Sequence, residues 1–371
     1  MNSTLSRLFN EPQFSLDSRV KNRILLEEFN YLVRLHKEKC PEYFRVIRGL
    51  NLHPPYNDLE AIPFLPISLF KKHELKSIGE NEIFKVLVSS GTTNSKLSKI
   101  YIDEETAQLQ RLALSRILRT VLGEKRLPLL IIDSENTVRN YKEFNAQSAG
   151  IRGMMPFSNS QIFCLNPDMS LNTDVLRGFL SEYGERKFMI FGFTFMVWQH
   201  FYKEAQNLGL SLNLEKGVLL HSGGWKKLVD ESVSNREFRL ELNRMFNLTN
   251  IHNFYGMVEQ TGSIFLEDDS GYFCTSNFSD VIVRDPNTWS PTLPGQVGVL
   301  EVMSVLPRSY PGHAILTEDL ARELPEAENV SGWKGRKFEI LGRVPRAELR
   351  GCSDVHAEKF SNSTLEITGI S

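Results

Sequence analysis

Small hydroxyl residues and two lysines follow an apolar run at 86–88, where a strand is expected to end. A glycine among small residues lets backbone N–H groups converge on phosphate oxygens, and hydroxyl groups add further donors. The segment is not a Walker A loop, because GxxxxGK[ST] does not occur in the chain. Its composition is that of a phosphate-binding loop or of a solvated turn rich in Ser and Thr. The candidate phosphate ligands are Ser89, Ser90, Gly91, Thr92, Thr93, Lys96 and Lys99.

Four later segments place glycine, aromatic or charged residues in turns after apolar runs. They are 219–228 (LLHSGGWKKL), 253–262 (NFYGMVEQTG), 316–321 (LTEDLA) and 341–354 (LGRVPRAELRGCSD). Each segment alone is typical of an ordinary turn. Their order along the chain is more informative than any one of them.

Amphipathic helices and buried strands are expected to position these segments. Apolar residues recur at helical spacing in 17–38, with Asp17 as a candidate N-cap, and in 104–123, with Asp103 as N-cap. On the second helix the residues expected mostly on one face are Leu109, Leu112, Ile117, Leu118 and Val121. Short apolar runs predict strands at 127–133, 187–193, 216–222, 297–305 and 337–344. Helical segments separate the first three strands, and strands dominate after Asp280, so we predict an α/β core with a strand-rich C-terminal part.

The bulk composition excludes several classes of protein. The chain has 371 residues, which fits one large domain or two domains. A net charge of −2 gives no sign of a nucleic-acid partner. The four cysteines are scattered without a CxxC pair, which fits a reduced, cytoplasmic protein. We see no secretory signal and no apolar run of ~18 residues, so no membrane span is expected.

The order of the segments resembles that of the adenylate-forming enzymes, which include acyl-CoA synthetases and phenylacetate–CoA ligases. In that superfamily a Ser/Thr/Gly-rich loop holds the ATP phosphates and a Gly-Gly segment borders the adenine. In the Tyr-Gly-x-x-Glu segment that follows, the tyrosine stacks on adenine and the glutamate holds magnesium. A Thr-x-Asp segment binds the ribose hydroxyls, and a Gly-Arg pair opens a hinge. The resemblance implies ATP and Mg²⁺ as cofactors, and the matching residues are Gly223, Gly224, Trp225, Tyr255, Gly256, Glu259, Thr317, Asp319, Gly342 and Arg343.

A narrower resemblance, to the LuxE family of acyl-protein synthetases, runs from about residue 20 to about residue 355. It is carried by IPFLPISLFKKHEL, SSGTTNSKLSKI, GGWKK, PGQVGVLEVM, SYPGHAILTEDLA and RGCS. That family supplies fatty acyl groups to a partner reductase. The resemblance implies an ATP-dependent enzyme that converts a carboxylic acid, of the fatty-acid type, to an acyl-adenylate. The acyl group would then pass to a cysteine of the enzyme and on to a protein such as a reductase, a transferase or a carrier protein.

The chain also departs from the superfamily pattern. Asn94 stands where glycine is frequent in the phosphate loop, Val258 where threonine is common, and Glu318 replaces the glycine of Thr-Gly-Asp. Ordinary members carry a C-terminal domain of roughly a hundred residues with a lysine that assists adenylation, whereas a short tail follows Arg343 here. We therefore expect an adenylate-forming large domain of stacked mixed sheets with helices at 1–340, and a hinge with a short tail at 341–371.

Acyl-adenylate formation requires a carboxylate to attack the α-phosphorus of ATP, so magnesium and N–H donors must neutralise the charge that develops. Glu259 is the candidate magnesium ligand, and a surface carboxylate at a helix start is the alternative. Tyr255 offers a flat face for adenine, and packing in the core or at its rim is the alternative. Asp319 can accept hydrogen bonds from both ribose hydroxyls. Lys99 is the candidate lysine for charge neutralisation during catalysis.

Cys352 is the candidate acyl carrier. An acyl-adenylate is a mixed anhydride that acylates a thiolate readily, and Arg346 and Arg350 could lower the thiol pKa below its free value of ~8.5. The alternative is a small hydrophobic residue without chemistry. The cysteines expected to be structural are Cys40, Cys164 and Cys274.

The aromatic segment 191–201 (FGFTFMVWQHF) precedes the Gly-Gly loop, where the superfamily often lines its acyl site. The candidate wall residues are Phe193, Phe195, Met196 and Trp198, with His221 at the border. A plain core stripe and a satisfied buried histidine are the alternatives. Two other functions also stay open. One is an acyl-CoA or acyl-carrier-protein ligase, in which Cys352 is incidental, and the other is a non-catalytic nucleotide-binding subunit.

Overall fold

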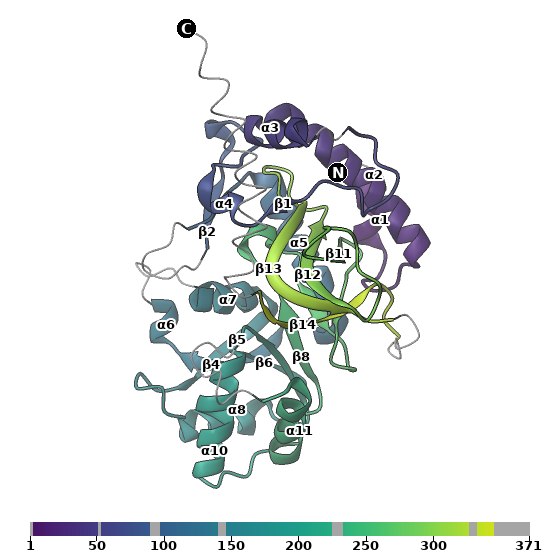
Figure 1. Cartoon of the computed structure of the whole chain (residues 1–371). Helices are drawn as coiled ribbons and strands as arrows, with labels where there is room; N and C mark the ends of the chain where they lie inside the picture. Colours follow the sequence, from purple (N-terminus) through teal and green to yellow (C-terminus); the bar gives the residue numbers. More distant parts are fainter. Residues whose placement is uncertain are drawn as a thin grey trace. The chain divides into compact units, whose positions relative to one another are not determined.

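The computed structural model describes residues 3–50, 53–89, 97–139, 146–224, 233–325 and 332–344 (Figure 1). The chain divides into two compact units, which are described separately. Unit 1 comprises Met1–Ile117, Gly256–Phe265 and Cys274–Ser371, and unit 2 comprises Leu118–Tyr255 and Leu266–Phe273. In the part of the chain that the structure describes, no helix is long and apolar enough to cross a membrane.

Unit 2 contains a parallel sheet in the order β5-β4-β6-β7-β8. Its strands are β4 (Leu127–Ser134), β5 (Ser158–Leu165), β6 (Phe188–Phe193), β7 (Gly217–Ser222) and β8 (Ile251–Tyr255). The strands predicted at 127–133, 187–193 and 216–222 are confirmed. Their nearly continuous apolar runs fit a parallel sheet that is covered on both faces.

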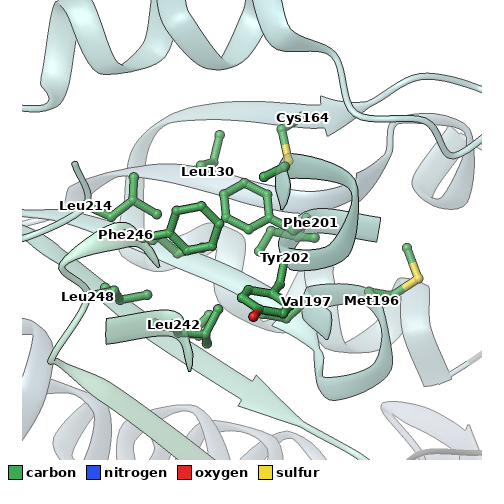
Figure 2. Close-up of a cluster of buried hydrophobic side chains, with 14 of the residues drawn as sticks. Leu130, Cys164, Met196, Val197, Phe201, Tyr202, Leu214, Leu242, Phe246 and Leu248 are labelled. Carbon is green, nitrogen blue, oxygen red and sulfur yellow. The ribbon is translucent and has the colours of Figure 1, made fainter. Parts of the chain in front are cut away.

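Helices pack against this sheet and enclose the core of unit 2. They are α6 (Asn136–Arg139), α7 (Ala146–Met154), η2 (Met155–Phe157), α8 (Thr173–Tyr183), α9 (Thr194–Met196), η3 (Val197–Lys203), α10 (Glu204–Asn207) and α11 (Asn235–Phe246). Alternate strand residues such as Leu130 and Leu219 meet apolar residues of α8, η3 and α11. Figure 2 shows the rings of Phe201 and Phe246 side by side in this cluster, with centroids 5.2 Å apart.

Unit 1 contains an antiparallel sheet in the order β11-β12-β13-β14, and β1 pairs with β13 in parallel. Its strands are β1 (Leu65–Pro66), β11 (Ser279–Arg284), β12 (Val297–Ser304), β13 (Ala314–Glu323) and β14 (Lys337–Arg343). The short strands β9 (Phe265–Glu267) and β10 (Phe273–Cys274) lie where the chain passes between the units. The predicted strand-rich C-terminal part is confirmed. The predicted boundary at residue 341 falls within β14 and stays a prediction.

Helices and one hairpin complete unit 1. They are α1 (Ser3–Asn10), α2 (Ser18–Lys39), α3 (Pro41–Gly49), α4 (Leu69–Lys72), η1 (Glu80–Glu82), η5 (Val258–Gln260) and the hairpin strands β2 (Lys85–Val88) and β3 (Lys99–Ile102). The predicted N-cap Asp17 is confirmed, because its Oδ1 accepts a hydrogen bond from the Arg19 backbone at 3.0 Å. In Figure 1, α2 is one of the long purple helices near the N-terminus.

Helix α5 (Glu104–Leu122) starts in unit 1 and ends in unit 2. Its predicted N-cap is confirmed, because Asp103 Oδ1 accepts a hydrogen bond from the Thr106 backbone at 2.8 Å. The placement of Leu112 on the buried face was wrong, since its side chain is 38% exposed. Ala113 occupies that face instead, because it lies at the i, i+4 spacing between Leu109 and Ile117.

Two stacked histidines lie in the interior of unit 1. The rings of His36 and His313 have centroids 5.2 Å apart, and Tyr43 Oη lies 3.2 Å from His313 Nε2. Burial lowers the pKa of His313 to about 3. Burial and the neighbouring His313 also hold the pKa of His36 well below its usual range. Both rings are therefore neutral near pH 7. At any pH at which the unfolded chain would protonate these two histidines, their burial opposes folding.

This burial predicts a loss of stability in acid. A histidine with a lowered pKa in the folded state does not reduce stability at pH values above its unfolded pKa of ~6.5. Below that value it reduces the free energy of unfolding, and the reduction grows as pH falls toward the folded pKa. When pH is lowered from about 7.5 to about 5, the free energy of unfolding should fall by about 2 kcal/mol less in His313→Gln than in the wild type. Urea denaturation of both proteins at the two pH values measures the difference.

The comparison between the two proteins is the test, because other buried groups also titrate. Burial raises the pKa of the Glu301 carboxyl to about 7, and this group changes stability in the opposite sense. An equal pH dependence in the wild type and in His313→Gln would contradict the assignment.

Candidate nucleotide site

The predicted phosphate loop connects the two strands of the β2–β3 hairpin. Ser89 N–H donates to the Ser98 carbonyl at 3.0 Å, and Ser98 N–H donates to Ser89 Oγ at 2.9 Å. These two bonds close the hairpin just before the Ser/Thr-rich turn. Lys99 lies opposite Val88 in the strand register and is exposed. Five of the predicted ligands lie outside the described residues: Ser90, Gly91, Thr92, Thr93 and Lys96.

Glu259 lies in η5 and is only 3% exposed, so the alternative of a surface carboxylate is wrong. Burial raises the pKa of its carboxyl, while the side chains of Ser98 and Lys71 lower it. The Tyr310 hydroxyl donates to the Glu259 backbone carbonyl at 2.8 Å. Gly312 permits this contact, because a Cβ there would lie 2.3 Å from the Tyr310 ring. Glu259 is therefore a buried carboxylate on a backbone that is held in place, which suits it to bind a cation.

Asp319 and Arg343 are paired opposite each other on β13 and β14. The Arg343 Nε lies 3.6 Å from Asp319 Oδ1, and the arginine side chain is exposed. The Thr317 hydroxyl donates to the Leu300 carbonyl at 2.8 Å and accepts from Asp319 N–H at 3.1 Å. The Thr317 hydroxyl thus links β13 to β12 and helps to fix the backbone position of Asp319.

In unit 2, the candidate purine residues follow β7 and end β8. Gly223 has φ of +84°, a conformation that glycine adopts readily, and its backbone lies against Phe193. Gly224 follows it, and Trp225 lies outside the described residues. The Tyr255 ring lies 6.3 Å from that of Phe273, centroid to centroid. Gly256, the first residue of the next segment of unit 1, packs against Ile264.

Asn253 is a polar residue of this region that the sequence analysis missed. It shares a face of β8 with Tyr255, because side chains alternate along a strand. Its Oδ1 is buried and makes no hydrogen bond within the described part of the chain. The two-residue spacing to Tyr255 is the signal that could have identified it.

His221 lies next to Asn253 in the β7–β8 register. The Thr194 hydroxyl donates to the Ser222 carbonyl at 3.3 Å, so His221 Nδ1–H donates to Thr194 Oγ1 at 3.0 Å. This tautomer leaves Nε2 as an acceptor, and Nε2 has no partner among the described residues. Burial lowers the pKa of His221 to about 3, so the ring is neutral. His221 is thus buried with one ring nitrogen bonded, and both its place at the acyl site and the alternative of a structural histidine stay predictions.

The predicted acyl-binding residues lie around the start of the helical segment after β6. Phe193 is partly buried and Trp198 is 6% exposed in the core, stacked on Tyr202 with ring centroids 4.5 Å apart. Met196 is also buried in that core, and Phe195 packs against it. The core packing that was the alternative accounts for Trp198 and Met196 in this state. Acyl binding by Phe193, Trp198 and His221 stays a prediction.

The candidate acyl carrier, Cys352, lies outside the described residues. The other three cysteines are buried and form no disulfide within the described part of the chain: Cys40, Cys164 and Cys274. Burial raises the pKa of the Cys40 and Cys164 thiols, which makes them poor nucleophiles near neutral pH. The expectation that these two residues are structural fits their environment.

Comparison with known proteins identifies the family. The sequence profile described as "Acyl-protein synthetase, LuxE" matches residues 9–361. The long-chain-fatty-acid–luciferin-component ligase of Aliivibrio fischeri is 22% identical over 357 residues, covering 92% of this chain and 89% of the relative. The ligase of the same name from Vibrio harveyi is 23% identical over 367 residues, covering 94% of this chain and 91% of the relative.

A solved structure shows the fold. The open conformation of 2-hydroxyisobutyryl-CoA ligase, in complex with 2-HIB-AMP and CoA, superposes with a TM-score of 0.69 at 16% identity. The superposition covers 90% of this chain and 77% of that one. The predicted α/β architecture of an adenylate-forming enzyme and the resemblance to acyl-protein synthetases are therefore both confirmed. By its match over residues 9–361, the chain belongs to the LuxE family of acyl-protein synthetases, a family of acid–thiol ligases.

Proposed function

We propose that this protein uses ATP and Mg²⁺ to convert a fatty acid to an acyl-adenylate, and transfers the acyl group to Cys352 and then to a partner protein. The names of the two bacterial relatives, long-chain-fatty-acid–luciferin-component ligases, support a fatty acid and a protein acceptor. Within the structure, the buried Glu259 carboxylate is the observation that supports this proposal most directly. It lies close to Ser98, the residue that closes the predicted phosphate loop.

The surroundings of Glu259 fit a magnesium ion. A carboxylate whose pKa is raised by burial gains most from a nearby cation, which offsets the cost of desolvating its charge. The Ser98 side chain lies close enough to the Glu259 carboxyl to lower its pKa, so a hydroxyl oxygen is also at hand in this region of unit 1. When bound, magnesium would neutralise charge on the phosphates during pyrophosphate release.

The candidate nucleotide-binding residues form three groups, which would bind the purine, the ribose and the phosphates of ATP. Tyr255 would stack on the purine, and Asn253 Oδ1 would accept a hydrogen bond from its amino group. Asp319 would accept hydrogen bonds from the ribose hydroxyls. Arg343 would release its ion pair with Asp319 and contact a phosphate oxygen instead. Lys99 would neutralise phosphate charge, with hydroxyl and N–H donors from the loop that precedes it.

Asn253→Leu should raise the KM for ATP about tenfold, because one hydrogen bond of ~1.4 kcal/mol to the purine is lost. The wild type should prefer ATP over ITP, which lacks the amino group, and the variant should have lost that preference. Acid-dependent pyrophosphate exchange measured with both nucleotides gives the two KM values. A variant that loses ATP and ITP activity equally would indicate a structural role for Asn253 instead.

The function is tested with purified protein, ATP, Mg²⁺ and a panel of radiolabelled carboxylic acids. Pyrophosphate exchange into ATP that requires a long-chain acid, together with acyl label on the protein, is the expected result. Exchange without protein label, with turnover that rises strongly on addition of CoA, would favour a ligase for a soluble thiol. No exchange with any acid of the panel would overturn the proposal and favour a non-catalytic nucleotide-binding subunit.

A further inference from the structure

The hairpin strand β2 has one edge that no described residue covers. Along an antiparallel pair, successive residues point their N–H and C=O groups alternately toward the partner strand and away from it. Ser89 N–H donates to the Ser98 carbonyl at 3.0 Å, so these two residues form a hydrogen-bonded pair. In the β2–β3 register the backbone groups of Val86 and Val88 therefore face away from β3. Neither backbone has a hydrogen-bond partner in the described part of the chain.

The opposite edge of the hairpin supports this assignment. Tyr101 is paired with Val86, so its carbonyl should also point out of the hairpin, from the outer edge of β3. That carbonyl accepts a hydrogen bond from Ser309 Oγ at 2.9 Å. The outer edge of β3 is therefore bonded to a neighbouring loop, whereas that of β2 is open within the described residues.

Apolar side chains line the open edge. Val86 and Val88 alternate along β2, so they lie on one face of the hairpin, and their side chains are 43% and 36% exposed. Phe84 and Leu97 flank the two strands and are also exposed. Proteins usually protect an exposed edge with charge, with a proline or with a covering segment. An open edge lined by valines is typical of a strand that pairs with a further segment.

Positive charge lies on the other face of the hairpin. Lys85 shares that face with Leu87, because side chains alternate along a strand. Burial and the nearby Arg111 of α5 lower the pKa of the Lys85 amino group. Neither cation forms an ion pair with a described residue. A segment that pairs with β2 would therefore be stabilised by apolar residues on one face and by an acidic residue on the other.

The sequence after β14 contains a segment of this kind. It is 364–368 (TLEIT), in which Leu365 and Ile367 alternate with Glu366. Alternation of this type, with β-branched residues, favours an extended strand. Residues 345–363 connect the segment to β14 and can span up to about 60 Å when extended. That length exceeds the distance across a domain of this size, whose radius of gyration is about 17 Å.

We propose that residues 364–368 add a third strand to the hairpin, along the open edge of β2. Val86 and Val88 would then bond their outward N–H and C=O groups to the new strand. The pairing does not depend on the proposed function, whereas its consequence for acyl transfer rests on it. Cys352 lies twelve residues before Thr364. The pairing would tether this thiol to the hairpin that carries the predicted phosphate loop, which raises its effective concentration near the acyl-adenylate.

Both possible directions of the new strand place the charges correctly. The apolar residues of the segment would lie beside the two valines of β2, because residues directly opposite each other share a face of a sheet. Glu366 then falls opposite Leu87, whether the new strand runs parallel or antiparallel to β2. Lys85 is two residues from Leu87 on the same face, so it is a diagonal neighbour of Glu366, within reach of long side chains. The added strand would thus give Lys85 an acidic neighbour.

Hydrogen exchange of the Val86 and Val88 amides tests the pairing directly. In the wild type these two amides should exchange at least about tenfold more slowly than in Ile367→Asp, which places a carboxylate beside the valines. Ile370→Asp is the matched control, because it makes the same change outside the proposed strand. Its exchange rates should equal those of the wild type.

A charge exchange tests the placement of Glu366. Glu366→Lys should speed exchange of the same two amides about threefold or more, because two cations would meet on one face of the sheet. Adding Lys85→Glu to this variant should restore slow exchange. Fast exchange that persists in the double variant would overturn the placement of Glu366 beside Lys85.

Equal exchange of the two valine amides in the wild type and in Ile367→Asp would overturn the proposal. If that exchange slows as protein concentration rises, a second copy of the chain covers β2 instead. If it slows only when an acyl-accepting protein is added, that partner supplies the strand. Each of these results excludes residues 364–368 as the occupant of the edge.

Acyl transfer separates the pairing from the proposed function. Ile367→Asp should keep acid-dependent pyrophosphate exchange and form the hydroxylamine-sensitive acyl label about tenfold more slowly, because Cys352 is no longer tethered. Slow exchange of the β2 amides in a wild type that shows no pyrophosphate exchange would support the pairing and overturn the proposed function. Labelling at the wild-type rate in Ile367→Asp, with the amide protection lost, would overturn the tethering of Cys352.

Discussion

Glu259→Gln should slow acid-dependent pyrophosphate exchange about 10²–10³-fold, the effect of removing one group that stabilises developing charge. The amide is nearly isosteric with the carboxylate but lacks the negative charge that binds magnesium. Stopped assays at saturating ATP, with magnesium varied, measure the change. We expect most of the loss to remain at high magnesium, because the ion that still binds would be held in the wrong place.

The stability of the same variant provides an independent check. Burial raises the pKa of the Glu259 carboxyl, so the ionised form opposes folding. A carboxyl of this kind costs stability above its folded pKa, and the cost disappears as pH falls toward its ordinary value of ~4.3. Without metal, Glu259→Gln should therefore be as stable as the wild type or more stable near neutral pH, with a gain that shrinks in acid.

The two measurements together decide the role of Glu259. Lost exchange in a variant with an unchanged or higher free energy of unfolding supports a metal ligand. Lost exchange together with a clearly lower free energy of unfolding would indicate that Glu259 acts through the fold. Exchange at the wild-type rate would contradict the proposed site.

Cys352→Ser should keep acid-dependent pyrophosphate exchange and lose all hydroxylamine-sensitive acyl label on the protein. The first half-reaction needs only ATP, magnesium and the acid, whereas the second needs a thiolate, and a serine hydroxyl without an adjacent base is a weak nucleophile. Labelling with a radioactive fatty acid, followed by hydroxylamine treatment at neutral pH, measures the thioester. Transfer of label to an acceptor protein should disappear as well.

Cys164→Ser is the control for this experiment. Cys164 is fully buried in unit 2 and burial raises its pKa, so its replacement should leave both exchange and label in place. Label that persists in Cys352→Ser would show that Cys352 does not carry the acyl group. Strong stimulation of that variant by CoA would instead favour a soluble thiol as the acceptor.

The sequence by itself determined the elements and the order of the motifs. Asp17 and Asp103 were found as N-caps because capping depends on residues within one helical turn. The strands of the parallel sheet were found because a strand covered on both faces is a short, continuous apolar run. Family membership followed from segments spread over the chain, which the match to residues 9–361 confirms.

Local patterns were less successful where packing decides which side of an element is buried. Leu112 fits an apolar helix face in the sequence, yet Ala113 takes the buried position. Trp198 and Met196 stand in an aromatic run that equally fits an acyl pocket or a core. Their neighbours in the described structure come from segments far away in the sequence, such as α11.

Only the tertiary structure brought together the groups around Glu259. Ser98 and Tyr310 belong to a hairpin and a loop, and no spacing in the sequence relates them to residue 259. Whether a polar side chain is satisfied depends on which atoms surround it in space, and sequence patterns carry no information about that. The physical reason is that periodicity and capping act over a few residues, whereas burial and hydrogen-bond satisfaction are set by contacts between segments far apart in the sequence, such as the 51 residues that separate Glu259 from Tyr310.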